Sequence, residues 1–403
     1  MTDLGIRLVE QDEYRAASNL FRQALHHGPM PDDQWEYSAR SYEAGRLFGA
    51  VRGDTLVGVA TSYGSRLTVP GGRALPMAAV TRVGVRADHT RRGVLTALMR
   101  HQLHDCRDRG EPFATLRASE AVIYGRFGYG VATRGRTLAV SPERAVPHPD
   151  APTGGTVRLL DRDEIGKVLP PLYERIGAPR PGMMTRPAGW WEAVLHRPLG
   201  TGENLVAAVH SGADGDDGFV LYQPKRKDGA EDFRAVLEVL DLHAATVEAS
   251  AALWRFLTRV DLVCRIEAWL RPLDEPVEWL FTDLRAVRTR KVEDETWLRL
   301  VDVPVALTAR EYGDADPVVI EVHDTVLPDN AGRYRICADG VERTDAPADL
   351  ELDVATLASV YLGDVPPSLL AAVGRVVVHD AAAPARADRL FGSTVVPWCG
   401  TFF

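Results

Sequence analysis

The stretch that decides the fold is VTRVGVRADHTRRGVLTAL, which runs from Val80 to Leu98. It opens as an apolar strand pattern, continues through a short polar segment, and closes with apolar residues at helical spacing. Arg91, Arg92 and Gly93 stand where the predicted helix starts. Backbone amides at a helix start bind anions, and a glycine there lets a phosphate approach the backbone closely. The stretch therefore predicts a phosphate-binding turn, although the same pattern also occurs as an ordinary surface cap.

The segments around this turn predict a domain that mixes strands and helices. Residues 6–10 indicate a strand followed by a helix, and residues 46–85 indicate an antiparallel meander with turns at RGD, YGS and PGG. The helix after Gly93 is expected to end at Gly110, and FATLRAS is the next predicted strand. The segment EAVIYGRFGYGVAT then predicts a short helix or turn that leads into another strand.

Two further units are expected after this domain. Residues 141–155, rich in proline and glycine, indicate a linker, and VRLLDRDEIGKVLPPLYERI repeats the strand-then-helix opening. Residues 241–250 of this second unit lack the glycine-arginine turn, and a third unit begins near residue 296. The predicted domains are therefore 1–145 with the phosphate turn, 146–290 without it, and 291–403.

Composition limits the kind of partner. The chain has 403 residues, of which 45% are hydrophobic and 26% charged, which is typical of a soluble protein with more than one domain. A net charge of −9 weighs against nucleic acid as a partner. Neither a membrane-spanning apolar run nor an export signal is present in the sequence, so we expect a cytoplasmic protein with no membrane partner.

The chain does not show a metal-binding pattern. Its four cysteines are scattered, without a CxxC pair or a Cys/His cluster. His101 and His104 are three residues apart on one predicted helix, but no further ligand completes the set. The acidic segment HSGADGDDG lacks the closing glutamate of a calcium loop, so we interpret it as a hairpin loop. We therefore expect no metal ion.

Two segments of the sequence are unusually rich in aromatic residues. VIYGRFGYG, from Val122 to Gly130, sets Tyr124 and Tyr129 among glycines, either as rings that fill a core or as a phenol held in a cleft. The chain ends in GTFF, and exposed aromatic residues there would favour aggregation. We therefore expect the aromatic tail to be buried.

The order of elements, with a phosphate turn after the fourth strand, resembles the GCN5-related N-acetyltransferases (GNATs). Their pyrophosphate loop reads Gln/Arg-x-x-Gly-x-Gly/Ala, and the matching stretch here is TRRGVL, in which Thr90 and Leu95 depart from the pattern. ASEAVIYGRFGYGVAT, together with RLTVPGG, TRRGVLTALM and the terminal Phe, resembles the Eis (enhanced intracellular survival) acetyltransferases. The resemblance implies an α+β fold, with two tandem GNAT-like mixed-sheet domains followed by a sterol-carrier-protein-like α/β domain. It further implies a homo-hexamer that acetylates amines, including aminoglycosides.

The resemblance also implies residue roles, with acetyl-CoA as cosubstrate. Tyr124 matches the general acid, since a phenol with a pKa of about 10 can protonate a thiolate with a pKa of about 8.5. The α-carboxylate of Phe403 matches the base, and its ordinary pKa of about 3.5 requires burial or a water relay for that role. The residues expected to bind acetyl-CoA are Val83, Val85, Thr90, Arg91, Arg92, Gly93, Val94 and Ser119.

The acceptor side departs from the family. Trp35 matches an aromatic residue of the amine pocket, but Phe402 replaces an expected glutamate, and Arg22 and Gln23 stand near an expected aspartate. Each lost charge-assisted contact weakens the binding of a polycation by about 1.5–3 kcal/mol. The sequence therefore favours a less charged or more apolar amine over an aminoglycoside.

Two other functions stay open. One is a non-catalytic scaffold that binds an apolar ligand through the sterol-carrier-like domain, which the departures at Thr90 and Leu95 allow. The other is an acyltransferase that uses a different acyl-CoA.

Overall fold

The computed structural model describes residues 4–226 and 233–403. The chain folds as two compact units. The first unit takes the residues up to Thr133 together with Pro179–Ala193 and Asp294–Phe403, and the second takes Arg134–Ala178 and Val194–Glu293.

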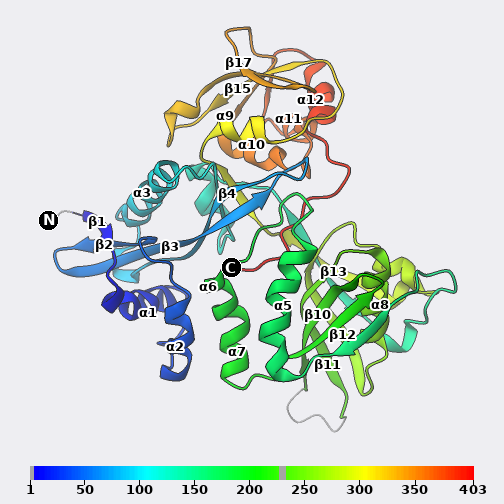
Figure 1. Cartoon of the computed structure of the whole chain (residues 1–403). Helices are drawn as coiled ribbons and strands as arrows, with labels where there is room; N and C mark the ends of the chain where they lie inside the picture. Colours follow the sequence, from blue (N-terminus) through cyan, green and yellow to red (C-terminus); the bar gives the residue numbers. More distant parts are fainter. Residues whose placement is uncertain (1–3, 227–232) are drawn as a thin grey trace. The chain divides into compact units, whose positions relative to one another are not determined.

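A seven-stranded mixed sheet lies at the centre of the first unit (Figure 1). Its strand order is β1-β2-β3-β4-β5-β14-β6, and only the β4–β5 pair within it is parallel. Strands β2, β3 and β4 form the meander that the sequence predicted. The bounds are β1 (Leu4–Leu8), β2 (Leu47–Arg52), β3 (Thr55–Thr68), β4 (Ala74–Val85), β5 (Phe113–Leu116), β6 (Gly130–Val131) and β14 (Trp297–Leu300).

Helix α3 follows β4 and packs one apolar face on the sheet. Leu98, Met99 and Leu103 on this face are fully buried, in keeping with the helical spacing of the sequence. The helix ends at Asp108, and Gly110 adopts the left-handed conformation that closes it. The helices of this domain are α1 (Tyr14–Ala24), α2 (Asp32–Arg40), α3 (Val94–Asp108) and α4 (Ala121–Tyr124), and α6 (Ala188–Trp191) belongs to the same unit.

Strand β14 completes the first sheet from far along the chain. It lies between β5 and β6 and is antiparallel to both, with Trp297 opposite Leu116 and Leu298 opposite Gly130. All its side chains are buried, as expected of a strand covered on both faces. By sequence position alone, this stretch is expected at the start of the third unit, whereas it pairs within the first sheet.

The second unit holds another seven-stranded sheet, with the order β13-β7-β12-β11-β10-β9-β8. At its β11–α8 turn the side chain of Thr246 accepts a hydrogen bond from the Ala249 amide, so the start of α8 is capped. One of the first amides of α8 is therefore already engaged by a side chain of the turn. The elements are β7 (Arg134–Val140), β8 (Thr156–Leu159), α5 (Arg162–Ile176), α7 (Arg197–Gly200), β9 (Val206–Gly212), β10 (Gly215–Lys225), β11 (Ala235–Ala244), α8 (Val247–Thr258), β12 (Val263–Arg271) and β13 (Val287–Asp294).

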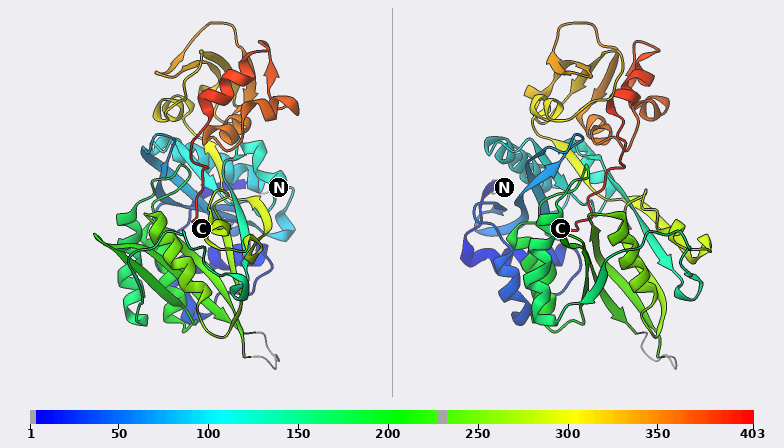
Figure 2. Two further views of the ribbon diagram at one scale, coloured as in Figure 1. Left: turned by 90° about the vertical axis from the view of Figure 1, so that its right-hand side faces the viewer. Right: turned by 45° about the vertical axis from the view of Figure 1, so that its right-hand side comes forward.

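The C-terminal part of the first unit forms a five-stranded sheet, with the order β17-β16-β15-β18-β19 and helices packed against it. After α12 the chain leaves this sheet and runs as an extended tail to Phe403 (Figure 2). The elements are α9 (Val303–Ala309), β15 (Val318–His323), β16 (Gly332–Cys337), β17 (Gly340–Arg343), β18 (Leu350–Asp353), α10 (Val354–Tyr361), α11 (Pro367–Ala372), β19 (Val377–Val378) and α12 (Ala383–Phe391).

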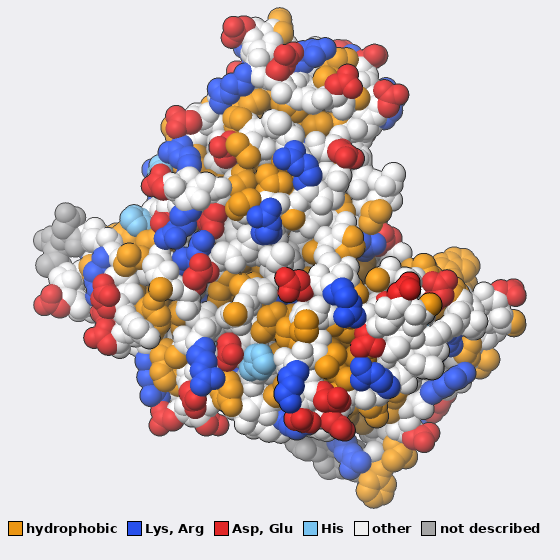
Figure 3. All heavy atoms as spheres, viewed as in Figure 1, with side chains coloured by type: hydrophobic (Ala, Val, Ile, Leu, Met, Phe, Trp, Pro, Cys, Tyr) orange, Lys and Arg blue, Asp and Glu red, His pale blue; other side chains and the backbone are white. Residues whose placement is uncertain are grey.

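Two further features concern the charged surface and the apolar character of the helices. On the face shown in Figure 3, acidic and basic side chains are interspersed and do not gather into one basic patch. Within residues 4–226 and 233–403, no helix has both the length and the apolar character to span a bilayer.

Candidate active site

The turn between β4 and α3 presents unpaired backbone amides to open space. Gly93 is the N-cap of α3 in the left-handed conformation, with φ +82°, and no side chain caps the helix. The Ala97 amide makes the first bond of the helix, to the carbonyl of Gly93, so the amides before it have no partner within the helix. A Cβ atom built on Gly93 would meet no other atom within 4 Å. The start of this helix therefore has the geometry that binds an anion.

A cavity of about 510 Å³ opens beside this turn. It contains eight of the residues that the family resemblance indicated, which come from the end of β4, the turn, the first turn of α3 and the segment around α4. Arg92 is exposed and is not part of the lining. The selected residues that line the cavity are Val83, Val85, Thr90, Arg91, Gly93, Val94, Ser119 and Tyr124.

Tyr124 closes one side of the cavity. Its side chain is only 6% exposed, and its ring lies edge-on to the ring of Tyr129, with 6.1 Å between the centroids. Burial raises the pKa of the Tyr124 phenol above its ordinary value, while a hydrogen bond with Ser119 opposes the rise. Tyr129 is buried in the core, so the two tyrosines of VIYGRFGYG have different surroundings. The Tyr124 ring is packed and also faces the cavity, which combines the two alternatives that the sequence left open.

The departures from the family loop are accommodated within the turn. The hydroxyl of Thr90 donates to the carbonyl of Ala87 at 3.0 Å and thereby braces the turn. Leu95 adds an apolar wall to the cavity. Nearby, hydrogen bonds from His89 and Arg86 lower the pKa of Asp88 to about 2, so this carboxylate is ionised and paired at neutral pH.

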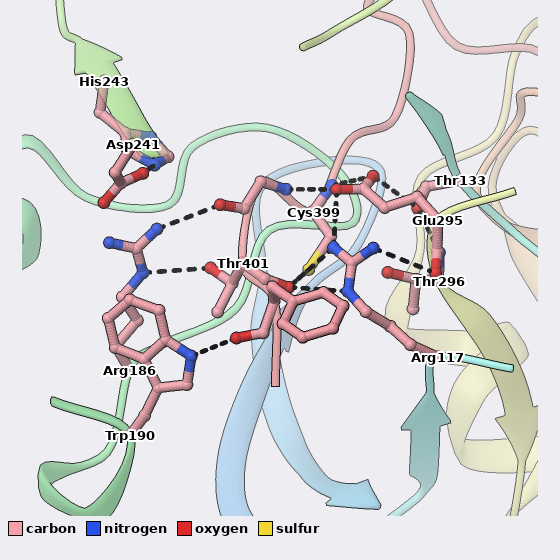
Figure 4. A network of polar contacts seen from close by, with 12 residues as sticks. Arg117, Thr133, Arg186, Trp190, Asp241, His243, Glu295, Thr296, Cys399 and Thr401 are labelled. Carbon is pink, nitrogen blue, oxygen red and sulfur yellow. Dashed lines mark hydrogen bonds and ion pairs between the residues drawn. The ribbon is translucent and has the colours of Figure 1, made fainter. Parts of the chain in front are cut away.

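The C-terminal tail is clamped on one side by Glu295 and Arg117 (Figure 4). The buried Glu295 carboxylate accepts hydrogen bonds from the amides of Cys399 and Gly400, at 3.0 and 2.8 Å. Arg117 donates two hydrogen bonds to the carbonyl of Thr401, at 3.2 and 2.9 Å. Because Arg117 directly follows β5 in the chain, the tail ends close to the segment that leads to the cavity.

Arg186 and Trp190 hold the other side of the tail (Figure 4). Arg186 donates to the hydroxyl of Thr401 and to the carbonyl of Gly400, both at 3.1 Å. The indole of Trp190 donates to the carbonyl of Phe402 at 2.6 Å. Nothing in the sequence pattern marked these clamping residues, because they lie far from the tail along the chain.

The burial expected of the aromatic tail holds only in part. Trp398 and Thr401 are buried, and Phe403 is partly buried against a hydrophobic cluster whose members come from the first sheet as well as from the C-terminal sheet. The ring of Phe402, however, is 54% exposed, so its expected burial is wrong. The physical reason is that the Trp190 indole binds the backbone carbonyl of this residue, while the ring lies beside the guanidinium of Arg117, 5.1 Å away, and stays open to solvent.

The expected acceptor residue Trp35 lies outside the cavity lining. It sits on α2, with its ring 6.3 Å from that of Tyr42, and the guanidinium of Arg15 lies 5.9 Å from the Trp35 ring. Asp32 begins α2 and pairs with Arg15, so it serves the local structure. Among the residues that the structure describes, no three histidine, cysteine, aspartate or glutamate side chains are grouped to hold a metal ion.

Comparison with known proteins agrees with this architecture. Residues 5–132 and 182–300 each match the family model of an acetyltransferase (GNAT) domain, and residues 303–400 match that of a sterol carrier protein domain. The N-acetyltransferase Eis of Mycobacterium bovis is 38% identical over 362 residues, which cover 86% of each chain. The chain belongs to the Eis family of N-acetyltransferases.

Two further relatives span the full length of this Eis-family chain. An uncharacterized N-acetyltransferase of Streptomyces avermitilis is 37% identical over 401 residues, or 98% of each chain. The crystal structure of Eis1 from Mycobacterium abscessus superposes with a TM-score of 0.89 at 43% identity and covers both chains completely. The predicted α+β fold and the acetyltransferase class are thereby confirmed, and the GNAT fold implies that the enzyme binds acetyl-CoA.

Proposed function

We propose that this enzyme transfers the acetyl group of acetyl-CoA to the amine nitrogen of a small molecule, and that it does so in the cavity beside the β4–α3 turn. The observation that carries the proposal is that one cavity joins the open amides at Gly93 and the buried phenol of Tyr124. The first feature suits a pyrophosphate, and the second suits a leaving thiolate that needs a proton.

The lining residues would divide the binding of acetyl-CoA between them. The amides after Gly93 would hold the pyrophosphate, and Arg91 and Arg92 would add positive charge at the turn. Thr90 would shape the turn from within, through its bond to Ala87. The end of β4, with Val83, Val85 and the start of α3 at Val94, would hold the pantetheine arm, and Ser119 would orient the phenol of Tyr124.

The chemistry needs one acid and one base. A neutral amine attacks the thioester carbonyl, so that a C–N bond forms and the C–S bond breaks. Tyr124 gives its proton to the departing sulfur and regains one from solvent. Since burial raises the pKa of this phenol, it stays protonated at neutral pH and can act as an acid.

The proton of the attacking amine would pass to the carboxylate of Phe403, directly or through water. The clamp on Cys399, Gly400 and Thr401 supports this assignment, because it fixes the tail beside the end of β5. Phe402, with its exposed ring, and Trp35 would contact the acceptor. An enzyme extended by several residues after Phe403 should lose activity, and full activity would refute this role of the carboxylate.

A direct test measures binding and turnover separately. Acetyl-CoA should raise the melting temperature, and CoA release should depend on an added amine, with aminoglycosides included in the amine panel. Stabilisation by acetyl-CoA without acetylation of any amine would favour the scaffold alternative. Faster turnover with propionyl-CoA or malonyl-CoA would favour a different acyl donor, and light scattering would test the homo-hexamer that the family resemblance implies.

A further inference from the structure

Arg82 occupies a β-bulge at the edge of the cavity. Val59 on β3 pairs with Gly84 on β4, and Thr61 pairs with Thr81, so Arg82 and Val83 together face a single residue of β3. The backbone of Arg82 is left-handed, with φ +50°, which is uncommon for a residue other than glycine. Bulges re-aim side chains next to active sites, and strained backbone of this kind points to function.

The guanidinium of Arg82 has one buried donor without a partner. Its Nη2 donates to the hydroxyl of Ser41 at 2.6 Å, whereas its Nη1 is buried and makes no hydrogen bond. The group lies 4.3 Å from the ring centroid of Tyr42 and 5.7 Å from that of Tyr63. An unpaired buried donor on a charged group is costly and calls for a ligand or water that satisfies it.

Neighbours of Arg82 connect it to the acetyl-CoA cavity and to the end of the tail. Val83, the next residue after Arg82, lines the cavity. Ser41, which Arg82 binds, lies against α6, where its carbonyl oxygen would be 2.9 Å from a Cβ atom on Gly189. Trp190, the next residue of α6, holds the carbonyl of Phe402. Arg82 is therefore next in the chain to a residue of the cavity, and its partner Ser41 lies against the helix that holds the tail.

The positive charge of Arg82 is not balanced by a carboxylate. Among the described residues, none lies within the 4.0 Å of an ion pair with it. Glu43 is engaged by Arg46 and by the amide of Gly64, both at 2.7 Å. The Oε2 atom of Glu192 lies 3.8 Å from Nη1 of Arg40, and Arg40 is the residue before Ser41.

We infer that Arg82 selects an acceptor that carries a carboxylate as well as its amine, so that the substrate class is that of amino acids and similar zwitterions. This inference rests on the proposed acetyl transfer. The open Nη1 donor of Arg82 matches a carboxylate oxygen, with which a guanidinium forms a charge-assisted hydrogen bond. The rings of Tyr42 and Tyr63 hold the guanidinium between them and the Ser41 hydroxyl, and its positive charge would repel a polycation.

The test compares acceptors that differ only by the carboxylate, namely L-phenylalanine with phenethylamine and L-lysine with cadaverine. The wild-type enzyme should have the higher kcat/KM for the member with the carboxylate. In Arg82→Met the ratio of the two kcat/KM values should fall by about 10- to 100-fold, since one charge-assisted contact is lost. Arg82→Lys should restore part of the ratio, and Arg66→Met, at an exposed arginine of β3, should leave the ratio as in the wild type. A ratio that Arg82→Met does not change would overturn the inference.

A binding measurement separates this inference from the proposed function. The CoA-bound enzyme is titrated with N-acetyl-L-phenylalanine and with N-acetylphenethylamine by calorimetry. The wild-type enzyme should bind the first compound more tightly, and this preference should be lost in Arg82→Met and partly kept in Arg82→Lys. That outcome supports the role of Arg82 even if no tested amine is acetylated. A lack of acetylation would count against the proposed function alone. Equal binding of the two compounds by the wild-type enzyme would overturn the inference even if acetyl transfer is observed.

Discussion

Replacing Gly93 by alanine tests the anion-binding turn, because the same helix offers a matched control. Gly93 and Gly110 lie at opposite ends of α3, both have positive φ (+82° and +70°), and a Cβ atom at either position would meet no atom within 4 Å. Alanine at either site therefore carries the same left-handed strain, about 1–2 kcal/mol. Loss of stability should be similar in Gly93→Ala and Gly110→Ala.

Only Gly93→Ala should weaken acetyl-CoA binding, because its methyl group would occupy the space over the open amides. If one hydrogen bond from an amide to the pyrophosphate is lost, worth about 1.5–3 kcal/mol, the Kd should rise by about 10- to 150-fold. Calorimetry with acetyl-CoA measures this change, and S-acetylpantetheine, which lacks the pyrophosphate, should bind both variants alike. The reasoning is refuted if Gly93→Ala and Gly110→Ala bind acetyl-CoA with the same affinity.

Two further variants test the acid and the tail. Tyr124→Phe should lower kcat by about 10²- to 10⁴-fold with little change in acetyl-CoA affinity, and a rate within threefold of the wild type would remove Tyr124 as the acid. Burial raises the pKa of the Tyr124 phenol, and the protonated acid is present below that pKa and is lost as the pH rises through it. The wild-type rate should therefore not fall through ionisation of Tyr124 below about pH 10. Glu295→Gln should speed hydrogen exchange of the Cys399 and Gly400 amides, because the carboxylate accepts hydrogen bonds from both. The displaced tail should also lower kcat by about 10²-fold. Unchanged exchange would show that the clamp does not depend on the charge of Glu295.

Local features of the site could be predicted from the sequence. The turn at Gly93 follows from a strand, a polar loop and a helix that are contiguous in the chain, and the helix end at Gly110 follows from glycine in the left-handed conformation. Which residues line the cavity together could be predicted only from the family resemblance. For Tyr124 the residues alone favoured a packed ring over a phenol in a cleft, since local pattern does not show what packs around a ring.

Long-range features could not be predicted in this way. Arg117 and Thr401 meet although 284 residues separate them, and Trp297–Leu300 enters the first sheet between strands from the start of the chain. Periodicity indicates that such segments are strands or tails but does not name their partners. The bulge at Arg82 depends on the register of β3 against β4, and local sequence pattern does not show that register.

A crystal structure of the enzyme with acetyl-CoA bound tests most directly whether the β4–α3 turn and Tyr124 form the acetyl-transfer site. We expect the pyrophosphate to lie on the amides after Gly93 and the thioester sulfur to lie within hydrogen-bond distance of the Tyr124 hydroxyl. A pyrophosphate bound away from this turn, or a sulfur out of reach of Tyr124, would contradict this expectation.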